Sequence, residues 1–268
     1  MKQAIRNVLG VAGLLLMIAS LVWISFHQEK RPPVYKESTA TQPQTSKPFA
    51  VVVLDPGHGG EDSGAMCAGV MEKDLTLDVA RRIDRLLDSE GIATLMTRLG
   101  DSYASLADRA AFGNRVKDSI FISIHFNEDN KPVASGVETY YAARQITSGS
   151  TLTSWLPFFS RPPSDTSNSP KPESQSLAGF IQEALVARTG SLNRGTQAKQ
   201  FFVIANVTSP AVLIEGGFIT NQDELSKLAS EDYRDQLAAA VADGILRYRD
   251  VVSQRKSALA VTVQKSAE

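Results

Sequence analysis

Cysteine and histidine are both scarce in this chain. Among 268 residues there is one cysteine, Cys67, so an intramolecular disulfide is impossible and cysteine usage does not indicate a compartment. A single cysteine also excludes the zinc motifs that are built from several cysteines. Histidine occurs three times, at His27, His58 and His125, and His27 lies outside the expected globular domain. Any metal site in that domain must therefore be completed by carboxylates.

The chain also lacks a strong excess of charge of either sign. Its formal net charge is −1, whereas proteins that bind nucleic acid hold its phosphates mainly with Lys and Arg. We therefore expect no nucleic acid partner. No internal repeat is found, so neither a tandem wall-binding module nor a solenoid is indicated. The length suits one domain of roughly 200 residues with extensions.

The N-terminal segment is apolar without interruption from residue 8 to residue 26 and is flanked by basic residues. This length is near the minimum for a membrane-spanning helix and long for a signal-peptide core. No clear cleavage site follows, so for residues 1–27 we favour an uncleaved signal-anchor over a removed signal peptide. In either case the protein is expected to be exported, to the periplasm or another extracytoplasmic compartment. Residues 28–47, rich in Pro, Ser, Thr, Lys and Gln, are typical of a flexible tether.

Strand and helix patterns alternate through residues 48–252, which we interpret as one catalytic domain. Strands are predicted at 49–54, 92–97, 119–124, 136–141, 201–205 and 211–214, and helices at 72–87, 106–116, 176–188, 222–228 and 233–251. Ser105 can cap the second helix, with Asp108 three residues on. This alternation predicts an α/β fold: one mostly parallel twisted sheet of about six strands with helices on both faces. Residues 253–268 are expected to form a polar tail.

Residues 142–175 interrupt this alternation of strands and helices. They contain an apolar cluster with Trp155 and Phe158, followed by a stretch rich in Pro and Ser. A segment of this length is usually functional or disordered. It is expected to pack on the domain, to cover the active site, or to dock a partner.

Four ionisable residues stand at strand ends or helix starts. His58 lies in the hexapeptide Asp55-Pro56-Gly57-His58-Gly59-Gly60, directly after an apolar strand, and His125 follows another strand. Glu72 opens a predicted helix, and Glu215 follows the last strand. Open α/β sheets build their sites at the carboxyl ends of strands, so we expect all four side chains at one rim.

Two imidazoles and one carboxylate are a suitable ligand set for a catalytic zinc ion, which needs three protein ligands and one open position. The fourth group can then act as the general base. Taken singly, Glu72 also suits a helix start through the helix dipole, and His125 also suits a satisfied position in the core, but four coincident positions favour a site.

Four ordered motifs resemble the type-3 zinc-dependent N-acetylmuramoyl-L-alanine amidases of bacterial cell walls. They are the hexapeptide at 55–60, Glu72-Lys73-Asp74, residues 123–127 and Glu215-Gly216-Gly217-Phe218. Residues 97–98, 106–109 and 136–139 also look like that family. The resemblance covers roughly residues 50–250.

The resemblance implies one zinc ion bound by His58, Glu72 and His125, with Glu215 as the catalytic glutamate. It also implies cleavage of the amide between the lactyl group of N-acetylmuramic acid and the L-alanine of the peptidoglycan stem peptide, in wall remodelling or daughter-cell separation. Two departures stand out: Phe126 replaces the usual small residue, and the 142–175 segment is longer than in minimal members. Some relatives carry an autoinhibitory helix in this region, so an activator protein acting on residues 142–175 is plausible.

Three further polar residues lie near the expected site. Asp55 and Asn127 are candidates for orienting the ligands or contacting substrate, although Asp55 can equally cap its own turn. Glu138 is expected to be a solvated strand residue. Two other functions stay open: a zinc peptidase that cuts within the stem peptide, and a wall-binding or regulatory domain without activity. Phosphoryl transfer is disfavoured because no basic phosphate loop accompanies His58.

Overall fold

The computed structural model describes residues 49, 51–131, 133–146 and 169–265. The predicted signal-anchor at 8–26, the tether at 28–47 and most of the 142–175 segment lie outside these residues. Within them, no helix combines the length and the apolar character that a membrane span requires.

The domain is built on one six-stranded sheet. Its order is β4 (Ala93–Met96), β1 (Val51–Pro56), β5 (Ser119–Asn127), β8 (Ala211–Phe218), β6 (Val137–Ala142) and β7 (Asn193–Lys199). All neighbouring strands are parallel except β6 and β8, which are antiparallel. A small hairpin of β2 (Met66–Cys67) and β3 (Val70–Met71) stands apart from it. The expected mostly parallel sheet of six strands is confirmed.

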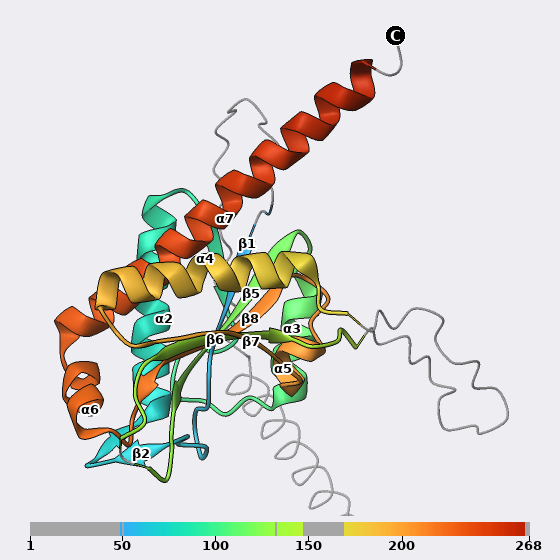
Figure 1. The fold of residues 1–268 in the computed structure, drawn as a ribbon. Coiled ribbons are helices and arrows are strands. Elements are labelled where there is room, and N and C mark those ends of the chain that lie inside the picture. The colour runs from blue at the N-terminus through green and yellow to red at the C-terminus, as the bar shows by residue number, and fades with distance from the viewer. Residues whose placement is uncertain (1–48, 50, 132, 147–168, 266–268) are drawn as a thin grey trace, which may run out of the picture. The chain divides into compact units, whose positions relative to one another are not determined.

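Helices cover both faces of this sheet (Figure 1). Side chains alternate between the two faces along each strand, so Val52 and Leu54 pack on one side and Val53 on the other. The first face is covered by α2 (Glu72–Ser89), α4 (Pro172–Thr189) and α7 (Glu231–Lys265). The second is covered by α3 (Leu106–Arg115) and α5 (Phe202–Ala205). The short α6 (Gln222–Ala229) precedes α7.

One predicted strand is wrong. Residues 201–205 were expected to be extended, but Phe202–Ala205 form α5, whose last three residues are buried. A short buried apolar run looks the same in a strand and in a helix, because periodicity alone does not separate them. The sixth strand is β7 instead, whose residues are mostly exposed. As an edge strand with few apolar residues, β7 carries no hydrophobic signal.

Helix starts follow the local chemistry. The Ser105 side chain accepts a hydrogen bond from the backbone N–H of Asp108, so the expected cap of α3 is confirmed. α4 begins at Pro172, four residues earlier than expected, because proline suits the first turn of a helix.

The last helix is longer than its pattern indicated. α7 continues to Lys265, so most of the expected polar tail is helical and runs on from the body of the domain (Figure 1). Residues 253–265 contain neither Gly nor Pro, so no strong helix breaker ends the helix after residue 251.

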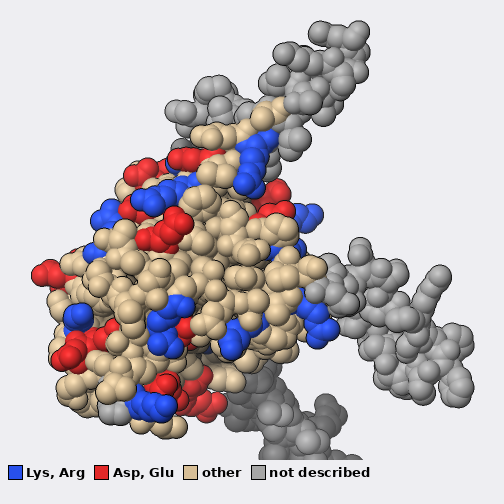
Figure 2. Space-filling model, viewed as in Figure 1, with Lys and Arg blue, Asp and Glu red and all other residues tan. Residues whose placement is uncertain are grey.

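Charges of both signs are interspersed over the face shown in Figure 2. This mixture matches the near-zero net charge of the whole chain. That face therefore lacks the single-sign field that steers a charged polymer toward a surface.

Candidate metal site and its surroundings

The loop after β1 is held by two buried arginines. The guanidinium of Arg98 donates to the carbonyl oxygens of Pro56 (3.0 Å) and Gly57 (2.9 Å). That of Arg109 donates to the carbonyls of Pro56 and His58, both at 2.6 Å. Both arginines are about as buried as core residues, at 4% and 3% exposed. Three successive carbonyls are thus fixed, which sets the direction in which the loop leaves the sheet.

Asp55 neither caps its own turn nor lines the metal site. Its carboxylate is fully buried and accepts hydrogen bonds from Arg109 (2.9 Å), Thr97 Oγ1 (2.6 Å) and Ser123 Oγ (2.8 Å). It therefore neutralises Arg109 and ties β1 to α3. Its link to the site is indirect, through the arginine that holds the loop.

Three side chains converge at the carboxyl ends of β1 and β5. One ligand atom from each of His58, Glu72 and His125 lies within 4.8 Å of the other two. Glu72 Oε2 is 3.1 Å from Nε2 of His58, and Glu72 Oε1 is 3.0 Å from Nδ1 of His125. The two imidazole rings meet edge to face, with their centroids 4.9 Å apart. The structure therefore brings together the three residues expected to share a metal.

Glu72 contacts both histidines and is the most buried residue of this cluster. It is 3% exposed, and its two oxygens also accept backbone N–H bonds from Ala65 (2.9 Å) and Phe126 (3.0 Å). Burial alone raises the pKa of this carboxyl, but the hydrogen bonds and charges of His125 and His58 outweigh it and lower the pKa below its usual range. Glu72 is thus an ionised, oriented carboxylate at the first residue of α2, suited to bind a metal.

His58 is oriented from its other ring nitrogen. Nδ1 lies 2.9 Å from Oδ2 of Asp62, which leaves Nε2 turned toward Glu72. Burial lowers the pKa of this imidazole, but Glu72 and then Asp62 outweigh burial and raise it. The backbone of His58 has φ 59°, in the left-handed region that a non-glycine residue adopts only when its surroundings impose it. A metal-binding histidine commonly pairs its second nitrogen with a carboxylate in this way.

Glu215 lies beside the cluster on the same face of the sheet. Sheet register pairs it with His125 on β5 and with Glu138 on β6. Its Oε2 atom is buried and has no hydrogen-bond partner among the residues that the structure describes. Burial, followed by the charges of Glu72 and Glu138, raises the pKa of Glu215 well above its usual value. A carboxyl group with high proton affinity and no internal partner is suited to exchange a proton with a ligand.

Glu138 is buried, not solvated as expected. It is 1% exposed and accepts hydrogen bonds from Asn127 Nδ2 (2.8 Å) and Gln197 Nε2 (3.1 Å). The Nε atom of Arg194 lies 3.5 Å from its Oε2. The expectation failed because Gln197 and Arg194 come from β7, the edge strand that the sequence did not reveal. The side-chain amide of Asn127 accordingly orients Glu138 and not one of the three clustered residues.

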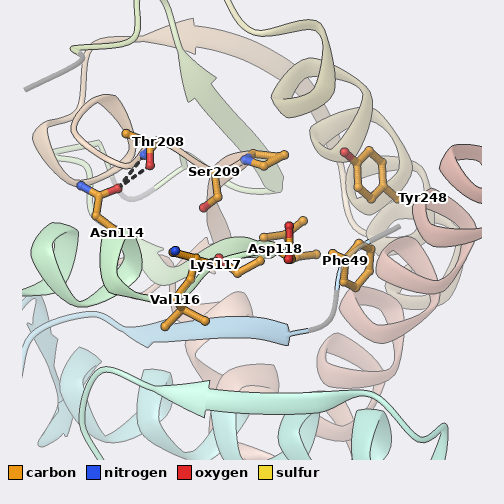
Figure 3. A pocket seen from close by; sticks show the side chains of 11 residues that line it. Phe49, Asn114, Val116, Lys117, Asp118, Thr208, Ser209 and Tyr248 are labelled. Carbon is orange, nitrogen blue, oxygen red and sulfur yellow. Dashed lines mark hydrogen bonds between the residues drawn. The ribbon is translucent and has the colours of Figure 1, made fainter. Parts of the chain in front are cut away.

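A cavity of about 480 Å³ lies at the opposite end of the sheet from this chemistry (Figure 3). It is lined by residues that precede β1, β5 and β8, among them Phe49, Asp118 and Pro210. One wall is fixed by Thr208, which donates to Asn114 from its backbone N–H (2.7 Å) and its hydroxyl (3.0 Å). None of the clustered histidines and glutamates lines this cavity. The candidate site is therefore identified by its ionisable side chains and not by the cavity.

Sequence reasoning singled out His58, Glu72, His125 and Glu215 but missed the residues that position them. Asp62 had a detectable signal, because it stands four residues after His58 on a glycine-rich turn. The residues 97–98 and 106–109 were noted only as part of a resemblance, without a role for Arg98 or Arg109. Nothing in a local pattern indicates that either arginine is buried.

Gly57 gives a test of this geometry. A Cβ atom at Gly57 would lie 2.3 Å from Cε1 of His125 and 2.6 Å from its Nε2, so Gly57→Ala must displace that ring. We expect the variant to bind a divalent metal about 10- to 100-fold more weakly, as when the orientation of a ligand is lost. Competition with a chromophoric chelator measures the affinity.

Gly100→Ala is the matched control, because a Cβ at Gly100 meets no atom within 4 Å. Equal metal affinity in Gly57→Ala and wild-type protein would contradict the described placement of His125.

Comparison with known proteins supports one family. The sequence profile of the N-acetylmuramoyl-L-alanine amidase family matches residues 52–247. N-acetylmuramoyl-L-alanine amidase LytC of Bacillus subtilis (strain 168) is 32% identical over 216 residues, which are 81% of this chain and 39% of LytC. The germination-specific N-acetylmuramoyl-L-alanine amidase of the same organism is 30% identical over 215 residues, covering 74% of this chain and 79% of that protein.

The fold agrees with this assignment. The crystal structure of an N-acetylmuramoyl-L-alanine amidase from Clostridium difficile 630 superposes with a TM-score of 0.62 at 32% identity, over 76% of this chain and 98% of that one. This chain belongs to the N-acetylmuramoyl-L-alanine amidase family, and its globular domain is an amidase domain.

Proposed function

We propose that this domain hydrolyses the amide between the lactyl group of N-acetylmuramic acid and the L-alanine of the peptidoglycan stem peptide. His58, Glu72 and His125 hold one zinc ion, and Glu215 transfers the proton. The observation that carries the proposal is the convergence of the three ligands directly beside an unpartnered, buried carboxylate oxygen. Peptidoglycan amidase relatives support the choice of substrate.

The three residues fit zinc by their chemistry and spacing. Imidazole nitrogen and carboxylate oxygen are common zinc ligands, with bonds of about 2.0–2.2 Å. Glu72 already lies 3.0–3.1 Å from each imidazole, so an ion between them needs only small adjustments of the side chains. Three protein ligands leave a position for water, which is the arrangement of a catalytic zinc.

Each residue then has a defined part in the reaction. Zinc bound there supplies Lewis-acid activation of water and of the substrate carbonyl. Glu215 takes a proton from the attacking water and returns it to the leaving alanine nitrogen. Its raised pKa makes Glu215 a stronger base, which favours the first of these two steps. Asp62 keeps the His58 ring in the tautomer that turns Nε2 toward the ion.

Digestion of purified sacculi tests the activity. Residues 48–268 loaded with zinc should release stem peptides with a free N-terminal L-alanine, identified by mass spectrometry. A chelator should abolish the release and added zinc should restore it, because the activating ion is lost and regained. Fragments cut within the stem peptide would instead identify a peptidase, and tight binding to sacculi without any product would identify a wall-binding domain.

Glu215→Gln separates proton transfer from metal binding. The amide keeps the shape of the side chain but cannot accept the proton, so kcat should fall by about a hundredfold or more. Zinc content, measured by atomic emission, should match the wild-type protein because Glu215 is not a ligand. Undiminished turnover would reject the assigned role of Glu215.

We also propose an exported protein that is anchored in the inner membrane by residues 8–26 and controlled by an activator acting on residues 142–175. Cell-wall relatives support the export. A solved structure of the CwlD amidase from Clostridioides difficile is a complex with the GerS lipoprotein, at 27% identity and a TM-score of 0.63, which supports the idea of a partner.

Two measurements test the anchor and the control. Cell fractionation should recover the full chain with the membrane, and a shortened soluble form would overturn the anchor. Deletion of residues 147–168, which leaves α4 intact, should raise amidase activity on sacculi if the segment restrains the site. Unchanged or reduced activity would count against that restraint.

A further inference from the structure

Three residues with ionisable side chains lie in a row across the sheet, near the carboxyl ends of β5 and β8. His125 on β5, Glu215 on β8 and Glu138 on β6 are register partners in turn, and paired residues direct their side chains to the same face. His125 belongs to the metal cluster and Glu215 to proton transfer. Glu138, the third residue, acts on Glu215 through its charge, which raises the pKa of that carboxyl group.

Glu138 has few features of a stabilising ion pair. Its carboxylate is 1% exposed, yet the nitrogen of Arg194 lies 3.5 Å away, longer than a good charged hydrogen bond. Removing a carboxylate from water costs several kcal/mol, and such pairs often add no net stability compared with apolar side chains. A buried charge that brings little stability and lies next to a reacting group is a candidate for a functional role.

The contacts of Glu138 form a closed circuit around the strand end that bears Glu215. Glu138 accepts a hydrogen bond from Asn127 (2.8 Å), and Asn127 is the register partner of Phe218. The Arg194 guanidinium lies over the Phe218 ring, 4.9 Å from its centroid, and reaches back to Glu138. The circuit therefore joins β5, β8, β7 and β6.

The end of β8 that bears Glu215 is held by side chains of other elements. The Oε2 atom of Glu215 has no hydrogen-bond partner among the described residues. Two glycines follow Glu215, and Gly217 has a φ of 142°, a conformation that glycine adopts more readily than other residues. Beyond them the backbone N–H of Phe218 donates to Glu224 Oε2 (2.7 Å), and Arg194 lies over the Phe218 ring.

We propose that Glu138 and Arg194 are positioning residues for Glu215. The charge pair holds Asn127 and Phe218, and these two residues keep the end of β8 in the geometry that presents the Glu215 carboxylate beside the metal cluster. The inference rests on the proposed role of Glu215 in proton transfer. Within the described part of the chain, no hydrogen bond or ion pair joins Glu138 or Arg194 to His58, Glu72 or His125, so the pair acts on proton transfer and not on metal binding.

Glu138→Gln in the zinc-loaded full chain is the primary test. The substitution keeps the side-chain shape but removes the charge and turns amide hydrogens toward the donors of Gln197 or Arg194. We expect kcat to fall about 10- to 100-fold, the range found when an orienting partner is lost. The KM and the zinc affinity should stay at wild-type values, a combination that general loss of structure does not produce.

Asp78→Asn is the control for stability. Asp78 pairs with Arg82 (2.8 Å) and Arg234 (2.5 Å) between α2 and α7, on the face of the sheet away from the row. It should lower the midpoint of unfolding and leave kcat unchanged. If both variants lose activity only in proportion to their stability, the positioning role is rejected.

Arg194→Met gives an independent readout if Glu138→Gln fails to fold. The Arg194 side chain is 35% exposed, so its replacement is tolerated more readily than that of a buried residue. It should lower kcat in the same way, and Arg194→Lys should restore part of the loss. A wild-type kcat in Arg194→Met overturns the proposal, whereas an active Glu215→Gln overturns the proposed function instead.

Discussion

The fixed carbonyl oxygens of the loop after β1 are the constraint on which the site depends. Arg98 and Arg109 are buried and bind the carbonyls of Pro56, Gly57 and His58, so these dipoles are directed into the protein. A buried guanidinium is costly unless its donors are satisfied, and here the backbone of the loop satisfies them. The loop therefore cannot relax without leaving N–H groups of both buried guanidiniums unsatisfied, and that coupling helps to hold His58 in its left-handed conformation.

The sheet register adds the second constraint. Asp55, Ser123 and the residues beyond them keep β1 and β5 aligned, so Gly57 arrives beside His125. Because Gly57 has no Cβ, the imidazole of His125 can occupy the space beside the loop and approach Glu72. Backbone N–H groups of Ala65 and Phe126 hold that carboxylate from two sides. The ligand set is thus preorganised by backbone geometry, which is the most rigid support that a site can have.

Sequence patterns revealed the parts of this arrangement that are local. Apolar runs before His58, His125 and Glu215 marked three buried strands, and parallel strands place their ends at one edge. The patterns failed where tertiary contacts decide the outcome. Residues 201–205 form a helix because their apolar side chains pack against the second face of the sheet. The burial of Glu138 depends on Arg194 and Gln197 from a polar edge strand. No property of the segment around Glu138 predicts that these two side chains contact it.

The direction of β6 and β7, which run opposite to the other four strands of the sheet, explains how Glu138 reaches Glu215. Residues at the start of a parallel strand lie at the edge away from the site, whereas β6 runs against β8 and brings its second residue opposite Glu215. Because β6 runs in the opposite direction, different strands contribute to the two parts of the site. Ligands come from the parallel part, formed by β1, α2 and β5, while the surroundings of Glu215 come from β8, β6 and β7. The candidate metal ligands and the surroundings of Glu215 thus come from largely different strands, and they meet where Glu215 pairs with His125 and where the charge of Glu72 raises the pKa of Glu215.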